Sequence, residues 1–317
     1  MADAEQSPRR SVIVGAGASF PYGLPLAGKL LTDARNQVLE LDRRRAEHRG
    51  GYHPHDEEIA RHNDWDLAVL KSIVPPNSLQ AVAQSFRDDL VQANLDDFVR
   101  DNPSLTPVVS MLITVALISS MYRQEAGIWT LIPNLRKAGA AFDKDWMRRF
   151  VGLVRPNATA ENKISIISFN YDSLLERSMN MYWLGAERKY TSFADGIEFV
   201  YPHGKFSNLP ERINDPQPFL IEQAAQLRLG ENRDQQSRDR AREIIAASQR
   251  IYSVGFSFSP DNVELLGLSK QQREVLFVQN FGNEIGVQRT LEKFKVEPSH
   301  WDHRDMDSLV TNGFFRQ

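Results

Sequence analysis

Glycine, serine, asparagine and histidine residues directly follow short apolar runs in this chain, and these residue types can hold a phosphate or move a proton. The first group is Gly15-Ala16-Gly17-Ala18-Ser19, which follows the apolar run Ser11–Val14 and precedes a helical pattern that begins at Leu26. A buried strand, a glycine-rich turn and a helix are a common way to present backbone N–H groups to a phosphate. Glycines at 15 and 17 would let the main chain approach a pyrophosphate closely.

The glycine-rich turn is a weak signal by itself. The dinucleotide-binding fingerprint has a third glycine, and Phe20 occupies that position here. A strand that ends in a tight turn explains the two glycines equally well. Both interpretations therefore stay open for this segment alone.

Four later polar or glycine-containing groups also follow apolar runs. They are Asn170-Tyr171-Asp172, His203-Gly204, Gly255-Phe256-Ser257 and Asn280. In an open parallel sheet, ligands bind at the carboxyl ends of the strands. We therefore expect all five groups to converge on one crevice. Taken singly each has a structural alternative, because Asn170 and Asp172 could cap a helix, His203-Gly204 could be a turn, and Ser257 could cap one.

The composition is that of a globular protein with both charge signs in balance. The chain has 317 residues, of which 41% are hydrophobic and 25% charged, and its net charge is −3. Nothing in this balance indicates direct nucleic-acid binding or a membrane surface. Cysteine is absent, which excludes disulfides, thiolate nucleophiles and cysteine zinc sites. The polar N-terminus has no signal-peptide core, and we read the interrupted apolar stretch 108–121 as a buried helix, so we expect a cytoplasmic protein.

Hydrophobic periodicity predicts an α/β fold with a Rossmann-like parallel sheet, helices on both faces and an all-helical insertion. The predicted strands are 11–14, 163–169, 197–201, 250–254 and 275–278. The predicted helices are 26–43, 78–100, 104–122, 133–154 and 173–183, with Asp261 capping one more. The segment 222–243 reads either as a surface helix or as a mobile stretch. We assign 1–42 and 161–296 to the Rossmann domain, 43–160 to the insertion, and 297–317 to an apolar tail that folds back or meets another subunit.

Two clusters of basic or histidine residues have simple explanations. Arg43-Arg44-Arg45 suits the solvated end of a helix, where positive charge complements the macrodipole, better than a nucleic-acid patch. His53, His55 and His62 raise a metal hypothesis. Pro54 and two glycines argue instead for loop histidines that face solvent, and we predict no metal site.

The ordered set of motifs resembles the sirtuin family, and more closely the sirtuin-like NAD-consuming domains of bacterial anti-phage defence. The family's Gly-Ala-Gly-x-Ser matches residues 15–19, its Asn-x-Asp matches 170–172, and its His-Gly matches 203–204. Its Gly-x-Ser turn matches 255–257, and its late strand ending in asparagine matches 275–280. The segment Leu95-Asp96-Asp97-Phe98 also looks like a helix motif common in the defence branch.

The chain departs from the family's deacylases in three places. It lacks the four-cysteine zinc ribbon, it has Leu26-Ala27-Gly28 where they have Asp-Phe-Arg, and it has Phe169 where they have a glutamine. These departures weaken the expectation of acyl-lysine recognition. They leave the parts that the resemblance assigns to NAD binding and to cleavage of its N-glycosidic bond.

The resemblance implies NAD as substrate, with Asn170, His203 and Asp172 as catalytic residues. Asn170 would hold a ribose hydroxyl and a water, and His203 would accept a proton. Asp172 would read the carboxamide or stabilise positive charge. The cofactor-binding residues would be Gly15, Ala16, Gly17, Ala18, Ser19, Gly255, Ser257 and Asn280.

Three functions are compatible with this set of residues. The first is an NAD⁺ hydrolase that acts as the effector of an anti-phage defence system and is gated by assembly or by a partner. The second is a non-catalytic sensor or scaffold that binds NAD or ADP-ribose, and the third is an NAD-dependent protein deacylase or ADP-ribosyltransferase. We expect a homo-oligomer. Because the chain has no phosphate loop of its own, any ATPase function would belong to a partner such as the helicase-like ATPases paired with some relatives.

Overall fold

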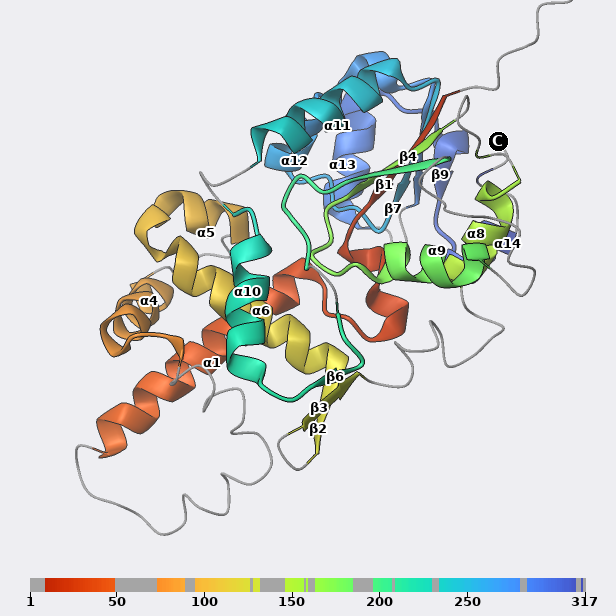
Figure 1. Ribbon diagram of the computed structural model, residues 1–317. Coiled ribbons are helices and arrows are strands. Elements are labelled where there is room, and N and C mark those ends of the chain that lie inside the picture. Colours follow the sequence, from red (N-terminus) through yellow and green to blue (C-terminus); the bar gives the residue numbers. More distant parts are fainter. Residues whose placement is uncertain are drawn as a thin grey trace, which may run out of the picture. The chain divides into compact units, whose positions relative to one another are not determined.

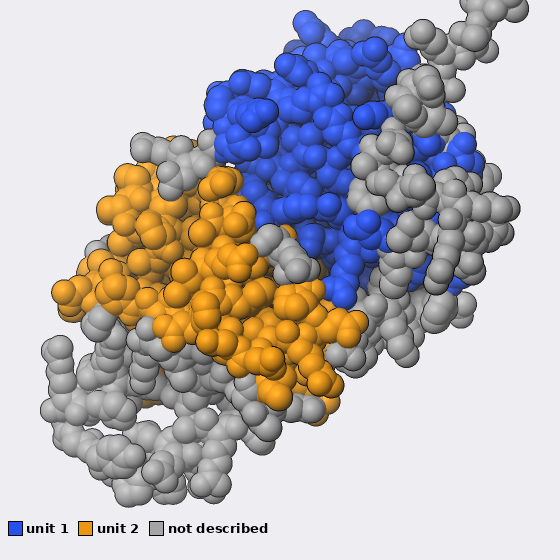
Figure 2. All heavy atoms as spheres, viewed as in Figure 1, with its two compact units in different colours: residues 1–22, 133–205, 233–317 blue, residues 23–132, 206–232 orange. Residues whose placement is uncertain are grey.

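The computed structural model divides the chain into two compact units (Figure 2). It describes residues 9–48, 73–88, 95–125, 128–131, 146–156, 158, 163–184, 196–206, 209–229, 234–279, 284–311 and 315. His53, His55, His62 and Asn280 lie outside these residues. Unit 1 comprises 1–22, 133–205 and 233–317, and unit 2 comprises 23–132 and 206–232.

A six-stranded parallel sheet forms the centre of unit 1, in the spatial order β5-β4-β1-β7-β8-β9 (Figure 1). Its strands are β1 (Arg10–Val14), β4 (Ile164–Ser168), β5 (Ile197–Val200), β7 (Arg250–Val254), β8 (Leu276–Gln279) and β9 (Trp301–Asp302). The central strand β1 is buried over residues 11–14, as expected for a parallel strand covered on both faces. The α/β class and the five predicted strands of this sheet are confirmed.

Helices cover both faces of the sheet (Figure 1). One face packs against α11 (Gln235–Ala247), α12 (Pro260–Leu266) and α13 (Ile285–Phe294) through a cluster that includes Ile13, Ile167, Val278, Ile244, Leu265 and Leu291. The other face carries α8 (Trp146–Val154), α9 (Leu174–Leu184) and α14 (Met306–Thr311). Successive side chains of a strand point to opposite faces, so Ile13 reaches the first cluster and Val12 the opposite face.

The C-terminal segment folds back onto unit 1, as one of the two sequence interpretations predicted. Strand β9 pairs with β8. The Phe315 ring lies 5.2 Å from the Tyr252 ring and 4.9 Å from the Phe150 ring, measured between centroids. These contacts account for the apolar character of the tail.

Unit 2 is mainly helical and is built around one apolar helix, α6 (Thr106–Met121). Its other helices, among the residues that the structure describes, are α1 (Ala27–His48), α4 (Pro76–Asp88), α5 (Leu95–Asp101) and α10 (Pro216–Gln226). The segment Pro103–Met121 is long and apolar enough to cross a membrane, but 72% of its apolar window is buried inside the protein. That burial is typical of the core helix of a soluble domain, as the sequence predicted.

Two short strands within 43–160 correct the prediction of an all-helical insertion. They are β2 (Tyr122–Glu125) and β3 (Ile128–Leu131), which form a second sheet with β6 (Arg212–Ile213) in the order β2-β3-β6. β2 and β3 pair antiparallel, and β6 comes from a part of the chain about 80 residues later. Four-residue strands are too short for period-2 alternation to stand out beside a long apolar helix.

Other boundaries also differ from the sequence predictions. The predicted helix 78–100 is represented by the two helices α4 and α5, and the segment 222–243 contributes to the end of α10 and to α11. Ser259, not Asp261, is the N-cap of α12, and its side chain makes no cap hydrogen bond. Pro260 at the first helical position fixes this start. The described part of the chain also contains 3₁₀ turns at η1 (Ala16–Ala18), η2 (Phe20–Tyr22), η3 (Pro103–Leu105), η5 (Lys270–Gln272) and η6 (Pro298–His300).

The compact units divide the chain at points other than the predicted domain borders. The predicted border at residue 42 falls inside the continuous helix α1, and the predicted tail 297–317 lies within unit 1. All the predicted site residues that are described also lie in unit 1. The site can therefore be described entirely within one unit.

Candidate functional site

The glycine-rich turn after β1 packs backbone against backbone on the turn after β7. The amide of Gly15 donates to the carbonyl of Val254 at 3.0 Å, and the amide of Gly17 donates to the carbonyl of Gly255 at 3.0 Å. A Cβ on Gly15 would lie 2.3 Å from the Gly255 oxygen. These glycines are thus required for the close approach of two turns, which is a different reason from the predicted approach to a pyrophosphate.

Gly255 is the residue of the turn after β7 that contacts the glycine-rich turn. It has a positive φ of 60°, and a Cβ there would lie 2.2 Å from the Ala18 nitrogen. Its amide donates to Gln279 Oε1 at 3.0 Å, and Gln279 Nε2 donates to the Arg304 carbonyl at 3.2 Å. Gln279 ends β8 and is buried. The predictions missed this residue because its role depends on which strand lies beside β7.

Most amides of the turn 15–19 are already used inside the protein. Besides Gly15 and Gly17, the amide of Ala18 donates to the Gly15 carbonyl at 2.9 Å and that of Ser19 to the Ala16 carbonyl at 3.1 Å. These two bonds form the 3₁₀ turn η1. Among the described residues, Ala16 is the member of the turn whose amide makes no such bond. A diphosphate at this turn would therefore meet fewer backbone donors than the sequence predicted.

Helix α8 fixes the far end of the same turn. The indole Nε1 of Trp146 donates to the Ala18 carbonyl at 2.9 Å, and the amide of Met147 donates to the Tyr22 hydroxyl at 3.2 Å. Trp146 is buried. The turn is thus held by β7 on one side and by the first residues of α8 on the other.

A buried chain of three polar side chains joins the turn to the end of β4. Asn170 Nδ2 donates to Ser19 Oγ at 2.9 Å, and Ser19 Oγ donates to Asp172 Oδ1 at 3.2 Å. The three residues are only 5%, 1% and 8% exposed. The sequence predicted that these segments converge, and the structure brings Ser19, Asn170 and Asp172 together.

Asp172 also supports the start of helix α9. Its Oδ1 accepts the amide of Leu174 at 3.0 Å, which matches the alternative interpretation that Asp172 has a capping role. Burial raises the pKa of Asp172 from 3.8 to about 6, while its bonds to Leu174 and Ser19 oppose this rise. The carboxyl group is therefore ionised at neutral pH and protonated in mild acid.

The ionised carboxylate sets the direction of the whole chain of hydrogen bonds. A carboxylate only accepts, so the Ser19 hydroxyl must donate to it, and Ser19 Oγ is left to accept from the Asn170 amide. This orients the Asn170 side chain with its Oδ1 pointing away from Ser19. That buried oxygen accepts no hydrogen bond within the described part of the chain. A buried acceptor without a partner costs about 1–3 kcal/mol, so it indicates a place where a ligand or water donates.

His203 lies in a group of aromatic rings at the neighbouring strand end. Its ring centroid is 5.2 Å from that of Phe169, which in turn is 4.9 Å from that of Phe256. His203 is 4% exposed, and its Nε2 lies 3.1 Å from Asn262 Oδ1. Asn262 is in α12, and the sequence predictions did not include it. Phe169 thus contacts the His203 imidazole and directly precedes Asn170 in the sequence.

The remaining predicted residues are less closely tied to the site. Ser257 is exposed on the turn that follows β7, and Asn280 falls in the part of the chain that is not described. Within the described ranges, no group of three or more His, Asp or Glu side chains is placed to hold a metal ion. The site consists of hydrogen-bonding side chains and aromatic rings.

Comparisons with protein-family models and with curated proteins find no match to this chain. The geometry of unit 1 is therefore the basis on which a function can be argued.

Proposed function

We propose that the protein is an NAD⁺ hydrolase that releases nicotinamide and ADP-ribose at the carboxyl ends of β1, β4, β5 and β7. The observation that carries the proposal is the buried Oδ1 of Asn170, which has no partner within the described residues and is oriented by Ser19 and Asp172. A ribose hydroxyl or a water is a donor of the size and polarity that this oxygen requires.

The strand order supports a dinucleotide as the ligand. Numbered along the chain, the strands of the six-stranded sheet lie in the order 3-2-1-4-5-6, which is the order of the doubly wound dinucleotide-binding fold. The order reverses at β1, because β4 and β5 follow on one side of it and β7, β8 and β9 on the other. Its two neighbours are β4 and β7. The turns after these three strands are the ones that carry Ser19, Asn170 and Gly255. We therefore propose that the sheet is Rossmann-like in function as well as in order.

A bound diphosphate would meet two hydrogen-bond donors in this arrangement. The Ala16 amide is the backbone donor of the first turn, and the exposed hydroxyl of Ser257 lies on the second. The other amides of the turn 15–19 hold the turn together and place Ala16. In this proposal the glycine-rich turn binds the diphosphate through the Ala16 amide, and its other amides hold Ala16 in position.

The cleavage itself needs a fixed ribose and one nucleophile. The bond between C1′ of the ribose and N1 of nicotinamide breaks, its electron pair goes to the ring nitrogen, and nicotinamide leaves neutral. Water adds to C1′ and loses one proton, which balances the reaction. Asn170 Oδ1 would orient the ribose or the water, and His203 would accept the proton, a contribution of about 10²–10⁴ in rate. Asp172 acts through Ser19 by holding the Asn170 amide.

A second candidate function is a module that binds NAD or ADP-ribose without cleaving it. The capping bond from Leu174 to Asp172 favours it, because this bond gives Asp172 a structural role that needs no reaction. In the hydrolase His203 accepts a proton, whereas in the binding module it takes part in no reaction. Both proposals predict that a nucleotide binds beside Asn170.

Control of the activity is a further part of the proposal. An NAD⁺ hydrolase that is always active would exhaust its host's NAD, so we propose an inactive resting state that is released by self-assembly or by a partner, in an anti-phage defence role. Unit 2 includes residues 43–132 of the predicted insertion 43–160, and it is our candidate for the assembly contacts. A helicase-like ATPase encoded nearby fits such a partner.

The test compares binding and turnover in the wild type and in His203→Ala, over a range of protein concentrations and with and without the product of the neighbouring gene. For a hydrolase, both proteins bind NAD⁺ with similar affinity by calorimetry, while nicotinamide release falls by about 100-fold or more in the variant. For a binding module, neither protein releases nicotinamide and both bind. Nicotinamide release that requires an added acylated or acceptor peptide would instead indicate a deacylase or a transferase. Absence of NAD⁺ binding in both proteins would contradict the proposal.

A further inference from the structure

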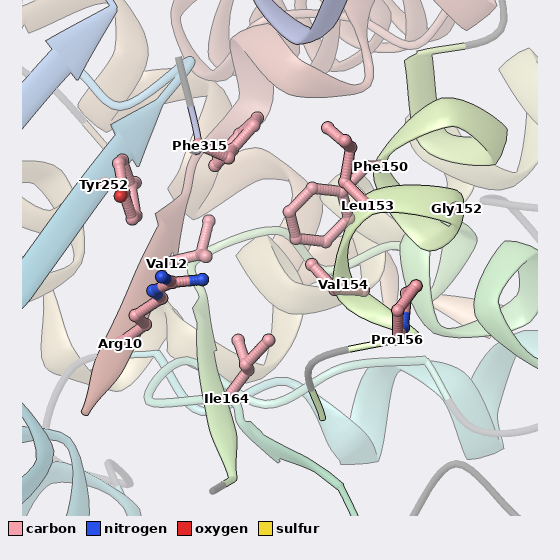
Figure 3. A pocket seen from close by; sticks show the side chains of 10 residues that line it. All are labelled: Arg10, Val12, Phe150, Gly152, Leu153, Val154, Pro156, Ile164, Tyr252 and Phe315. Atoms are coloured by element: carbon pink, nitrogen blue, oxygen red, sulfur yellow. The ribbon is translucent and has the colours of Figure 1, made fainter. Parts of the chain in front are cut away.

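Unit 1 contains a pocket that lies away from the strand ends of the candidate active site (Figure 3). Its volume is about 350 Å³, which lies within the range of small-molecule pockets. It is lined by Arg10, Val12, Phe150, Gly152, Leu153, Val154, Pro156, Ile164, Tyr252 and Phe315. Arg10 and Ile164 are the first residues of β1 and β4, so the pocket lies toward the amino ends of these strands.

The lining is apolar except for one cation and one phenol. Aliphatic side chains come from β1, β4 and α8, and aromatic rings come from Phe150, Tyr252 and Phe315. Val12, Val154 and Ile164 are buried. A ligand that fills this space must therefore have an apolar body.

Arg10 gives the pocket its charge. Figure 3 shows its guanidinium group turned toward the space between β1 and α8. Its Nε is buried and has no hydrogen-bond partner in the described part of the chain. A buried guanidinium N–H without an acceptor is costly, and a carboxylate is the acceptor that matches its geometry.

The pKa of the Tyr252 phenol agrees with a positively charged pocket. Burial raises the pKa of Tyr252, and the charges of Arg250 and Arg10 act against that rise. Both cations are thus close enough to act on the wall of the pocket. No acidic side chain is among the residues that line it.

We propose that this pocket binds a small amphipathic carboxylate, with its apolar body between β1 and α8 and its carboxylate on Arg10. The proposal does not depend on the NAD⁺ hydrolase function. It predicts that both the charge and the apolar body contribute to affinity.

Helix α8 connects this pocket to the candidate active site. Its first residue, Trp146, holds the turn that contains Ser19 through the Ala18 carbonyl, and its later residues line the pocket. The Trp146 and Phe150 rings lie 6.0 Å apart. Binding in the pocket should therefore change the fluorescence of Trp146, which provides a second readout of occupancy.

The test is calorimetric titration of the full chain with octanoate and, separately, with octan-1-ol. We expect saturable octanoate binding that is about tenfold or more weaker in Arg10→Met, and octan-1-ol binding that does not change in this variant. Arg9→Met is the matched control, because it removes the same charge from the preceding residue, which is exposed and lies outside the lining. It should leave octanoate affinity within about twofold of the wild type.

A second pair of variants tests the apolar part of the pocket. Val154→Phe enlarges a buried side chain of the lining and should weaken octanoate and octan-1-ol alike by about tenfold. Gly286→Ala adds a methyl group outside the lining, at a position where no heavy atom lies within 4 Å, and it should bind as the wild type does. Urea unfolding of each variant shows that it is folded, and Arg10→Lys, which keeps a positive charge, should retain part of the affinity.

Three results would overturn the proposal. The first is the absence of saturable octanoate binding up to about 10 mM, a limit that corresponds to a very weak site. The second is an equal loss of affinity in Arg9→Met and Arg10→Met. The third is unchanged octanoate affinity in a folded Val154→Phe protein.

Discussion

Ser19 and Asn170 are 151 positions apart in the chain, and a hydrogen bond of 2.9 Å joins the Asn170 amide nitrogen to the Ser19 hydroxyl oxygen. The bond links the turn after the central strand β1 to the end of the neighbouring strand β4. Because Ser19 also donates to Asp172, one hydroxyl group determines which way the Asn170 amide faces. The following predictions start from this relationship.

Ser19→Ala removes the hydroxyl that both neighbours use. The buried Asn170 Nδ2 then has no acceptor in place of Ser19, and Asp172 Oδ1 loses one of its donors. The free energy of unfolding should therefore fall by about 1–3 kcal/mol. Nicotinamide release should fall by about tenfold or more, because the Asn170 amide is free to turn. Urea unfolding and NAD⁺ turnover measure the two effects. Ser257→Ala is the matched control at an exposed serine, and it should change the free energy of unfolding by less than about 0.5 kcal/mol.

The raised pKa of Asp172 gives the protein a specific pH dependence. Its pKa is about 6 in the folded protein against 3.8 as the ordinary value, so the folded state binds this proton more tightly than the unfolded state does. The contribution of the group to stability is therefore greatest below about pH 4 and falls as the pH rises through 6, by about 3 kcal/mol in all. Asp172→Asn removes this dependence.

The measurement for Asp172 is the difference in the free energy of unfolding between wild type and Asp172→Asn from pH 4 to pH 7.5. The other carboxyl groups contribute equally to both proteins, so the difference isolates this residue. Activity should change in the opposite direction, because protonation of Asp172 below about pH 6 lets Asp172 donate to Ser19 and removes the fixed orientation of Asn170. A difference that stays flat with pH would show that Asp172 titrates as an ordinary surface carboxyl group.

Alanine substitutions at Gly255 and Gly267 distinguish the effect of backbone conformation on stability from the effect of close packing. Both have positive φ, 60° and 64°, so alanine is strained at either position. The nearest described atom to a Cβ at Gly267 is Arg242 Cγ at 4.0 Å, whereas a Cβ at Gly255 would lie 2.2 Å from the Ala18 nitrogen. We expect Gly267→Ala to lower the free energy of unfolding by about 1–2 kcal/mol, and Gly255→Ala to lower it by at least about 2 kcal/mol more. Equal losses in urea unfolding would mean that the two turns do not pack as described.

Asn262 provides a way to change His203 without touching it. Asn262→Asp places a carboxylate at the position 3.1 Å from His203 Nε2, which favours the imidazolium form. The pH at which turnover reaches half its maximum on the acidic side should then move upward by about one pH unit or more. Asn262→Ala should lower turnover without this upward shift. An identical turnover–pH profile in all three proteins would exclude His203 as the base.

The sequence was sufficient to predict five strands of the unit 1 sheet and to predict which polar residues lie together at its edge. Apolar runs predicted β1, β4, β5, β7 and β8, because buried parallel strands are hydrophobic on both faces. The rule that polar strand ends meet at one edge of a parallel sheet then predicted that Ser19, Asn170 and Asp172 converge. These are properties of local sequence and of general topology.

Features that depend on tertiary neighbours were missed. The two residues of β9 are too few to show a period, and the roles of Gln279 and Asn262 depend on which elements lie beside them. The glycines at 15 and 17 were correctly expected to allow a close approach, but the approaching group in this structure is the Gly255 turn. A sequence motif indicates that space is needed without identifying what fills it.

The central claim is that Asn170 takes part in cleaving NAD⁺, and release of nicotinamide by the full chain tests it most directly. The wild type, Asn170→Ala and the control Asn180→Ala, which changes an exposed asparagine of α9 in unit 1, are compared over a range of protein concentrations, with and without the product of the neighbouring gene. The account predicts that the activated wild type and Asn180→Ala release nicotinamide at the same rate and in a 1:1 ratio with ADP-ribose, and that Asn170→Ala is slower by about 100-fold or more. NAD⁺ consumption that is the same in folded Asn170→Ala as in the wild type, or its absence from all three proteins under every condition, would contradict it.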